Sequence, residues 1–478
     1  MFDILEADIV VFQETKIQRK DLSDDMVLVP GWDCYFSLPR YKKGYSGVAI
    51  YTRQSVCAPI RVEEGITGVL CPPNSSTPFC DLPPDQQIGG YPTKEQLEKS
   101  PIDAAALDSE GRAVLLEFPA FVLIGVYSPA NRDETRDEYR LGFLNALDAR
   151  VRNLDAMGKQ IFLTGDLNIL REELDAANAE ASMRKQGLSG FEFVSSPSRR
   201  LFNQLLGDGK VFGERDVGRE HPILHDICRA FHPLRKGMFT CWEQKVNARP
   251  ANCGARIDYV LCSLSMKDWF DGSNIQEGLM GSDHCPVYAV LGTTVRLRSK
   301  QVHLQDIMNP PGMFVNGNRQ RQYSANVDIL PMSARLIPEF TGRRNIRDMF
   351  TRAPSMSQVR ENGKPGRQVA SDEVSASNAP LSTTTSLPCS TTSQSEEIKS
   401  PEQRSRKHMR APTTTSTMNK RLKSTVTSAG PKEARKGQQS LQSFLKPPTN
   451  EATACTNGFG QATTEPQEVG MSMTEKKD

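Results

Sequence analysis

Short apolar runs recur along about the first 295 residues of this 478-residue chain and stop beyond about residue 350. Runs such as AVLLEF, FVLIGVY, IFLTG and RIDYVLC have the length and composition of buried strands. A core needs such segments, and the apolar share of 37% is low for a chain that folds along its whole length. The distribution predicts one large folded domain at residues 1–295, followed by a linker and tail at 296–478.

The order of the predicted elements indicates the fold class. Two apolar runs at 113–118 and 121–127 are separated by Pro119 and Ala120, which is typical of a hairpin. Further strands are predicted within IFLTGDLN and at 47–51, 256–262 and 287–291. A helix is predicted where apolar residues recur at helical spacing, namely at Tyr139, Phe143, Leu147, Val151 and Leu154. Strands that alternate with helices and hairpins favour a layered α/β sandwich over a helical bundle.

Two regions depart from this pattern. Residues 68–105 are dense in Pro, Gly and Ser, so we expect an inserted surface loop. From about residue 354 the chain is rich in Ser, Thr, Gln, Lys and Pro. Such a segment cannot bury enough apolar surface to offset the ordering entropy, roughly 1–2 kcal/mol per residue for the backbone, so we expect a disordered C-terminal tail.

Composition excludes several classes of protein. The 11 cysteines are odd in number and lack paired zinc-type spacing, which favours reduced thiols in a cytosolic or nuclear compartment. The sequence has no apolar run of about 18 residues, so no membrane span is expected. The opening MFDILEADIV lacks the basic and apolar segments of a signal peptide.

Four polar clusters lie at the ends of apolar strands: QET at 13–15, GDLN at 165–168, RID at 256–258 and GSDHCP at 281–286. Side chains at strand ends can converge on one rim of an α/β sandwich from distant parts of the chain. The clusters supply carboxylates, a carboxamide and an imidazole, namely Glu14, Asp166, Asp258, Asp283, Asn168 and His284. These groups suit hydrolysis of a phosphodiester with a hard divalent cation, Mg²⁺ or alternatively Mn²⁺.

Each cluster has an ordinary structural alternative when it is taken alone. GDLN is a common strand-to-turn sequence, an Asp-His pair is often a satisfied hydrogen bond, and Glu14 could cap a helix. The combination in this order and spacing is far more specific than any single cluster.

The segments DIVVFQETK, GVYSPANRDETRDEYR, FLTGDLNI, RIDYVLCS and GSDHCPV resemble the successive motifs of the exonuclease III family of abasic-site (AP) endonucleases. This resemblance covers residues 1 to about 295 and implies the endonuclease/exonuclease/phosphatase fold. That fold is a four-layer sandwich of two β-sheets flanked by helices. The insertion and the long polar tail are most similar to the second AP endonucleases of fungi.

The resemblance implies a role for each matching residue. Asp166 matches the aspartate that positions or deprotonates the attacking water, and Tyr127 matches the tyrosine at the phosphate. His284 matches the phosphate-binding histidine and Asp258 the aspartate that orients it. The implied metal site draws on Glu14, Asp166, Asn168, Asp283 and His284.

The implied DNA contacts come from three further positions. Asn168 matches a phosphate-facing residue, and Asn131 is a weaker match because Ala130 shifts its register. Trp242 matches an aromatic near the abasic pocket, with core packing as the alternative. Cys241 and Ala255 are smaller than their counterparts in many AP endonucleases, so a roomier pocket is expected.

Two departures from the family pattern concern the ends of the chain. Family members begin with a strand carrying a WNVNG-type motif, and this sequence starts downstream of that motif. We therefore expect the domain to lack its usual first strand, either because the sequence is a fragment or because the protein is compromised. The subgroup's C-terminal zinc module also has no match, because cysteines and histidines are scattered after residue 300.

The tail contains QQSLQSFL, with Gln438, Leu441, Phe444 and Leu445 in the spacing of a peptide that binds the sliding clamp, PCNA. Two basic clusters resemble a bipartite nuclear import signal: Arg406 and Lys407, then Lys420, Arg421 and Lys423. These features predict a monomeric nuclear enzyme of base excision repair. Its expected substrate is double-stranded DNA with abasic sites or damaged 3′ ends.

The implied activities are AP endonuclease, 3′–5′ exonuclease and 3′-phosphodiesterase. We hypothesise that 3′-end cleaning and exonuclease work matter at least as much as abasic incision, because of the roomier pocket. One alternative is another phosphodiesterase of the same fold, such as a lipid or inositol phosphatase, a deadenylase or a non-specific DNase. A second alternative is an inactive or weakly active, clamp-tethered DNA-binding fragment.

Overall fold

A six-stranded sheet forms the centre of the domain in a computed structural model, which describes residues 2–98, 100–130, 136–297 and 299–341. Its strand order is β4 (Arg61–Glu64), β5 (Ala113–Glu117), β6 (Val122–Tyr127), β7 (Ile161–Asp166), β11 (Asp258–Ser263) and β8 (Leu224–Asp226). Neighbouring strands are antiparallel except for β6 and β7. A parallel pair needs a crossover connection, and helix α5 (Asp137–Ala156) lies between these two strands in the chain.

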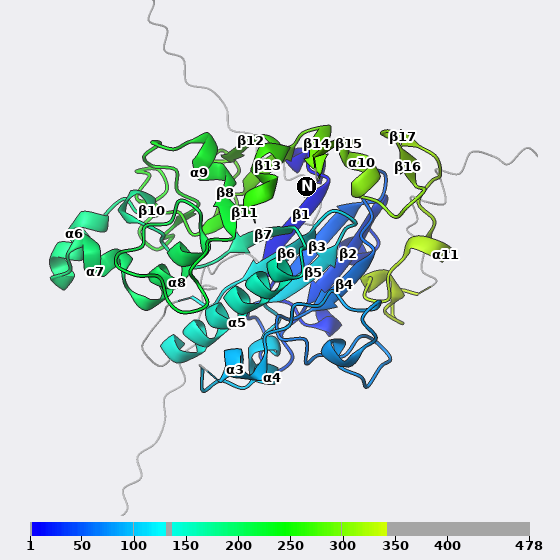
Figure 1. Ribbon diagram of the computed structural model, residues 1–478, viewed down its shortest axis with the longest axis horizontal. Helices are drawn as coiled ribbons and strands as arrows, with labels where there is room; N and C mark the ends of the chain where they lie inside the picture. The colour runs from blue at the N-terminus through cyan, green and yellow to red at the C-terminus, as the bar shows by residue number, and fades with distance from the viewer. Residues whose placement is uncertain (1, 99, 131–135, 298, 342–478) are drawn as a thin grey trace, which may run out of the picture. The chain divides into compact units, whose positions relative to one another are not determined.

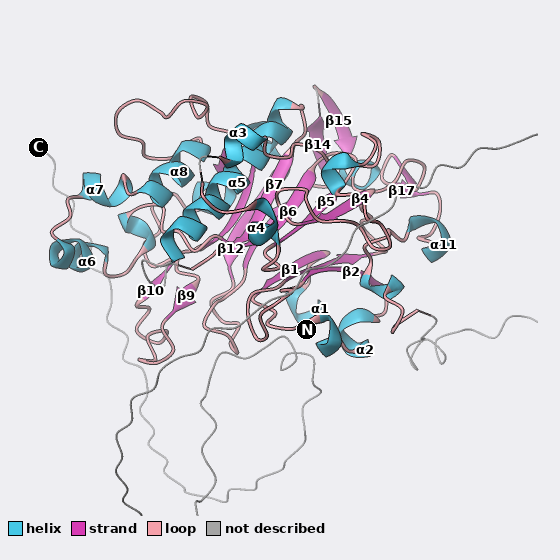
Figure 2. Cartoon of the chain, turned by 90° about the horizontal axis from the view of Figure 1, so that it is seen from below, coloured by secondary structure: helices cyan, strands magenta, loops and turns pink. Residues whose placement is uncertain are grey.

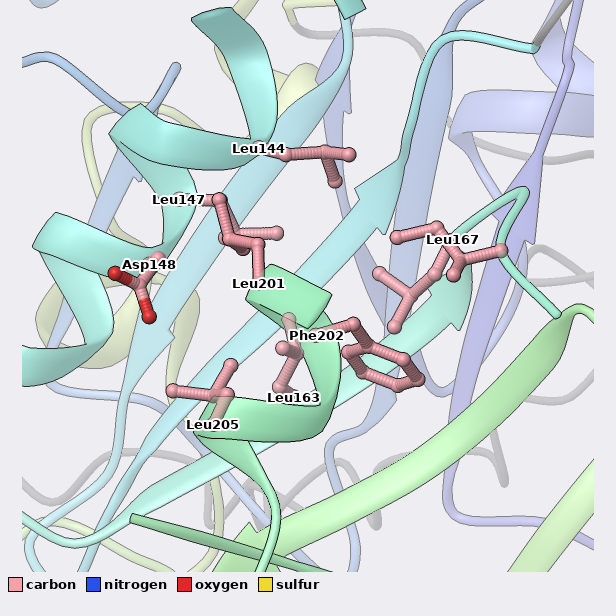
Figure 3. Close-up of a pocket in the computed structure, with 9 residues that line it drawn as sticks. Leu144, Leu147, Asp148, Leu163, Leu167, Leu201, Phe202 and Leu205 are labelled. Carbon is pink, nitrogen blue, oxygen red and sulfur yellow. The ribbon is translucent and has the colours of Figure 1, made fainter. Parts of the chain in front are cut away.

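Helices cover one face of this sheet. The predicted helix is confirmed as α5, whose apolar residues, among them Phe143, Val151 and Leu154, pack on Ile124 and Leu163 of the sheet. Three shorter helices accompany it: α3 (Lys94–Leu97), α4 (Ala104–Asp108) and α8 (Pro197–Leu205). Side chains of α5 and α8 meet over β7 around a void of about 10 Å³, which leaves no space for a ligand there (Figure 3).

A second β layer covers the opposite face. It contains the antiparallel strands β1 (Ile9–Gln13), β3 (Val48–Arg53) and β2 (Trp32–Ser37), and the hairpin of β12 (Phe270–Ile275) and β13 (Val287–Leu291). Strand β1 packs against β7, β3 against β6, and β13 against β11. Within the part of the chain that the structure describes, β1 pairs only with β3, and β13 only with β12.

The outer face of this second layer is covered by short helices, α1 (Phe2–Leu5), η1 (Arg19–Asp21) and α2 (Asp24–Val27). Met26 and Val27 of α2 are buried against Trp32 and Tyr51 of the strands. Figure 2 shows the four layers in order, with α3 and α5 above the six-stranded sheet, and β1, β2, α1 and α2 below it. The predicted four-layer sandwich is thus confirmed.

The chain between β7 and β11 forms an irregular lobe at one end of the sheet (Figure 1). Besides α8 and β8 it contains η4 (Glu173–Asp175), α6 (Ala179–Gln186), α7 (Gly190–Val194), α9 (Ile227–Phe231), β9 (Cys241–Trp242) and β10 (Gly254–Ala255). Strands β9 and β10 form a short hairpin. The helix η5 (Leu264–Trp269) joins β11 to β12. No helix in the described ranges is long and apolar enough to cross a membrane.

The insertion at 68–105 is not wholly the surface loop that the sequence predicted. It contains η2 (Phe79–Asp81), α3 and the start of α4, and the side chains of Phe79 and Ile88 are buried. The insertion is held by the buried Glu63 carboxylate, which accepts hydrogen bonds from Ile88 N (2.6 Å) and from Arg150 Nη2 (2.7 Å). The insertion covers the Glu63–Arg150 ion pair, and the pairing offsets the cost of burying the two charges.

The linker predicted from residue 296 is instead part of the folded unit as far as residue 341. The segment forms β14 (Thr294–Leu297), β15 (Lys300–His303), α10 (Leu304–Ile307), β16 (Phe314–Val315), β17 (Asn318–Arg319), α11 (Ala325–Asp328) and η6 (Ala334–Leu336). Met308 is buried in the main core, and the buried Asp33 carboxylate of β2 accepts hydrogen bonds from Tyr323 and Ser333. The apolar residues of this segment are sparse and have no regular period, so the sequence pattern did not predict its packing.

Candidate active site

Three predicted site residues meet at one rim of the central sheet because of strand register. Asp166 ends β7, Tyr127 ends the parallel neighbour β6, and Asp258 begins the antiparallel neighbour β11. Asp166 lies opposite Asp258 in one pairing and opposite Tyr127 in the other. The convergence predicted from strand-end clusters is therefore present for these three side chains.

The loop that precedes β13 brings His284 to the same rim. His284 Nδ1 is 2.8 Å from Asp258 Oδ2, and one ligand atom from each of Asp166, Asp258 and His284 lies within 4.8 Å of the others. The main chain fixes this loop, because Cys285 N donates to Thr240 O (2.8 Å) and His284 forms a β-bridge with Cys241. We name Asp166, Asp258 and His284 the rim cluster.

The pKa values of the rim cluster are shifted by burial and by the charges of its members. Burial and then the negative charge of Asp258 raise the pKa of Asp166 to about 8. Burial lowers the pKa of His284, but the charge of Asp258 and its hydrogen bond outweigh that effect and raise the pKa well above 6.5. A buried group of carboxylates with one imidazolium is short of positive charge, which a divalent cation would supply.

Asn168 lies directly beside Asp166. Its backbone N donates to Asp166 Oδ1 (2.8 Å), and its Nδ2 donates to Asp166 Oδ2 (3.0 Å) and to Ser128 O (2.8 Å). Asn168 adopts a left-handed conformation with φ +52°, which Asn tolerates better than most residues. This turn directs the carboxamide toward the rim, as the GDLN motif predicted.

Glu14 approaches the rim from β1 through Tyr127. The pKa of Tyr127 is raised first by burial and then by the charges of Glu14 and Asp166, and its side chain hydrogen-bonds to Glu14. Lys16 Nζ lies 3.2 Å from Glu14 Oε2. The segment from Glu14 to Lys16 packs closely against Gly47. A larger residue would not fit there, because a Cβ on Gly47 would lie 2.1 Å from Thr15 Oγ1.

The remaining predicted residues differ in position. Asp283 follows Ser282, whose Oγ lies 3.3 Å from Asp283 Oδ1, and the carboxylate is outside the 4.8 Å group. Trp242 is 4% exposed and packs in the core, with its Nε1 donating to Asn252 Oδ1 (3.1 Å). That burial favours the packing alternative for Trp242. Asn131 and the peptide at 438–445 lie outside the described residues.

Two supporting residues were missed from the sequence. Thr240 Oγ1 accepts hydrogen bonds from the backbone N of Ile257 (3.1 Å) and of Asp258 (3.2 Å), which fixes the start of β11. Arg112 Nη1 donates to Tyr127 O (3.0 Å), and its guanidinium carbon is 5.1 Å from the centroid of the Tyr127 ring. Neither contact follows from periodicity, since the partners are distant in sequence.

The donor set fits a hard divalent cation. The rim offers carboxylate oxygens from Asp166 and Asp258, an imidazole from His284, and the Asn168 carboxamide beside them. Oxygen ligands of this kind suit Mg²⁺ or Mn²⁺ rather than soft metals. The unfavourable ionisation of Asp166 is the observation that supports a cation at this rim.

Comparison with known proteins gives the same family as the motifs. The sequence pattern of the Endonuclease/Exonuclease/phosphatase family matches residues 3–284. The chain is 34% identical over 381 residues to DNA-(apurinic or apyrimidinic site) endonuclease 2 of Schizosaccharomyces pombe, covering 80% of this chain and 66% of that protein. It is 33% identical over 310 residues to the human protein of the same name, covering 62% of this chain and 54% of that protein.

A solved structure agrees with these relatives. The crystal structure of the Xenopus laevis APE2 catalytic domain superposes with a TM-score of 0.53 at 30% identity, covering 72% of this chain and 92% of that one. The chain spans only about half to two thirds of the full length of its AP endonuclease 2 relatives. On the match to residues 3–284 and on these identities, the chain belongs to the Endonuclease/Exonuclease/phosphatase family.

Proposed function

We propose that this chain is a DNA-repair nuclease that hydrolyses phosphodiesters at abasic sites and blocked 3′ ends, with a divalent cation. The observation that carries the proposal is the rim cluster, in which Asp166, Asp258 and His284 gather within 4.8 Å at the end of the central sheet. The names of the relatives support DNA as the substrate, since they include AP endonuclease 2 and a Bacillus subtilis exodeoxyribonuclease at 30% identity.

Each rim residue has a role that its surroundings allow. Asp166 accepts the proton of the attacking water in its ionised form, which the positive charge of a bound cation would favour. His284, held protonated by Asp258, donates a hydrogen bond to a non-bridging phosphate oxygen. Tyr127 and Asn168 contact the same phosphate from β6 and from the turn after β7.

The cation is proposed to be Mg²⁺, with Mn²⁺ as an alternative. When bound, it neutralises the scissile phosphate and the leaving oxyanion. The proposed ligands are Glu14, Asp166, Asn168 and Asp283. His284 is an alternative ligand in its neutral form only, because a protonated imidazole cannot bind a cation. Asp258 lies in the same 4.8 Å group and orients His284 through the 2.8 Å contact.

The central test is a nuclease assay on this chain with a duplex that contains one synthetic abasic site. We expect incision that requires Mg²⁺ and disappears with EDTA. Cleavage of inositol phosphates or of poly(A) RNA with no cleavage of the DNA would favour another phosphodiesterase of the fold. DNA binding without hydrolysis would favour the inactive, clamp-tethered alternative.

We propose that the balance of activities depends on the size of the side chains at the β9–β10 hairpin. Cys241 and Ala255 face each other across the β9–β10 hairpin, where family members often carry larger side chains. We propose that 3′-end cleaning and 3′–5′ exonuclease work matter at least as much as abasic incision. Rates on an abasic duplex and on a recessed 3′ mismatch decide this, and much faster abasic incision would contradict it. In the enzyme with Ala255→Trp, abasic incision should gain relative to exonuclease activity.

The tail is proposed to bind PCNA through Gln438, Leu441, Phe444 and Leu445, and to carry a nuclear import signal. The spacing Q-x-x-L-x-x-F-L in a polar segment supports the clamp proposal. Replacing Phe444 and Leu445 together by Ala should abolish capture on immobilised PCNA, whereas Gln461→Ala outside the motif should leave capture intact. Equal capture of both variants would refute the motif. A monomer is expected, which light scattering can test.

A further inference from the structure

Arg249 connects two loops at the rim of the site. It lies in the segment between β9 and β10, and its guanidinium reaches across to the segment that precedes Asp283 and His284. Nη1 donates to Ser282 O (3.1 Å), and Nη2 donates to Glu277 O (2.9 Å) and Leu279 O (2.8 Å). All three acceptors are backbone carbonyl oxygens, so the contacts constrain the path of the main chain.

The segment from 277 to 282, which we name the rim loop, has reasons to need such a constraint. It contains Gly278 and Gly281, and Gly281 adopts φ +113°, a conformation that is open to glycine. Its glutamate, methionine and glycines are exposed rather than packed in the core. Few side-chain contacts therefore hold a loop that leads directly into two proposed site residues.

Arg249 is itself held in place. Its guanidinium carbon is 4.5 Å from the centroid of the Trp242 ring, and Trp242 Nε1 is fixed by Asn252 Oδ1 at 3.1 Å. Trp242 N in turn donates to Asp283 O (2.9 Å). Trp242 thus holds Arg249 in place, and Arg249 holds the rim loop. The rim loop leads to Asp283, whose carbonyl oxygen accepts the hydrogen bond from Trp242 N.

We infer that Arg249 is a positioning residue, which sets the place of Asp283 and His284 through the backbone of the rim loop without touching the substrate. Planar guanidinium groups can satisfy several fixed acceptors at once, which an ammonium group cannot do with the same geometry. Misplacement of reacting groups by about 1 Å can cost about 10²-fold in rate. This inference rests on the proposed nuclease function only for its kinetic readout.

The first experiment compares Arg249→Ala with Arg235→Ala. Arg235 is a matched control because it bonds the same stretch of chain, but through side chains: Asn274 Oδ1 at 2.6 Å and the carboxylate of Glu277. Hydrogen exchange of the amides from 278 to 285 needs no activity. We expect faster exchange in Arg249→Ala than in wild type and Arg235→Ala. Unchanged exchange in Arg249→Ala would overturn the inference whatever the enzyme proves to do.

The second experiment measures steady-state cleavage of an abasic duplex over a range of duplex, Mg²⁺ and salt concentrations. We expect Arg249→Ala to lower kcat by about 10- to 100-fold with little change in KM, and Arg249→Lys to recover part of that loss. Arg235→Ala should behave as wild type. A raised KM with a shallower salt dependence would overturn the inference, because it would place Arg249 on a DNA phosphate.

Discussion

Two groups of buried charges lie near each other at one end of the central sheet and have opposite character. The rim cluster brings Asp166 and Asp258 together with a single imidazole. The second group, which we name the arginine cluster, surrounds two buried carboxylates with three guanidinium groups. It consists of Asp175, Asp226, Arg171, Arg229 and Arg256.

Burial raises the pKa of an aspartate in both groups, and the charged neighbours decide whether that effect is reinforced or reversed. Asp226 is fully buried, yet the charge of Arg256 and its 2.8 Å hydrogen bond outweigh the effect of burial and lower the pKa. Asp166 is also buried, and burial with the charge of Asp258 raises its pKa to about 8. The ionised form of a buried aspartate is therefore favoured in the arginine cluster and disfavoured in the rim cluster. The rim cluster is the group whose negative charge a bound cation would balance.

The largest effect should come from Asp166→Asn, which removes the proposed base and one carboxylate of the rim cluster. We expect kcat on an abasic duplex to fall by about 10³-fold, within the range for loss of general-base catalysis. The melting temperature without Mg²⁺ should be equal to or above that of wild type, because an unfavourable charge is gone. A clear loss of stability would contradict the contrast between the two clusters.

Breaking the arginine cluster should have the reverse outcome. Arg256→Met removes one partner of both Asp175 and Asp226 and should lower the free energy of unfolding by about 3–5 kcal/mol, as for other buried pairs that lose one member. Denaturant unfolding measures this loss. The control is Arg61→Met, because Arg61 pairs with Glu117 at a more exposed position and should lose no more than about 1 kcal/mol. Equal losses in both variants would show that burial of the pair is unimportant.

A smaller effect is expected at the link between Asp258 and His284. Asp258→Asn removes the charge that raises the His284 pKa, so the histidine should lose its proton at lower pH than in wild type. Activity should fall by about 10- to 100-fold, most strongly on the alkaline side of the pH–rate profile. A profile that is lowered equally at every pH would mean that the charge of Asp258 does not act through His284.

The smallest effect is expected at Glu64, a carboxyl group outside both clusters. Burial raises its pKa to about 7, although Ser37 Oγ donates to Glu64 Oε1 at 3.0 Å. A folded pKa above the unfolded value means that stability is present below about pH 4.5 and is lost as pH rises through about 7. Glu64→Gln should therefore gain about 1–2 kcal/mol relative to wild type at pH 8 and much less at pH 5.

Thermal unfolding at the two pH values measures this difference. Glu214→Gln, at an exposed position, is the control and should show no pH-dependent gain. A gain of equal size at pH 5 would mean that packing rather than charge explains the effect.

Local pattern predicted much of this molecule. Helical spacing of apolar residues predicted α5, apolar runs predicted the central strands, and strand-end clusters identified Asp166 and Asp258. Those features are readable because strand and helix periods are local. The contacts of Thr240, Arg112 and Arg249 were not readable, because each joins backbone groups that are brought together only by the folded sheet.

The C-terminal end of the folded domain could not be predicted from the sequence either. The family motifs end with the segment that contains His284, whereas the folded chain continues through η6 to residue 341. It is held by single polar contacts to Asp33 and by isolated apolar residues such as Met308 rather than by an apolar repeat, so composition alone suggested a linker. Position-specific hydrogen bonds of this kind leave no periodic signal.

The segment from 304 to 341 has a practical consequence for anyone who shortens this protein. A version cut after residue 295 would keep every motif of the family but would remove the hydroxyl groups of Tyr323 and Ser333 from the carboxylate of Asp33. It would also strip Met308 from the core. Such a version should express poorly for reasons unrelated to its chemistry, and residue 341 is the safer point at which to end.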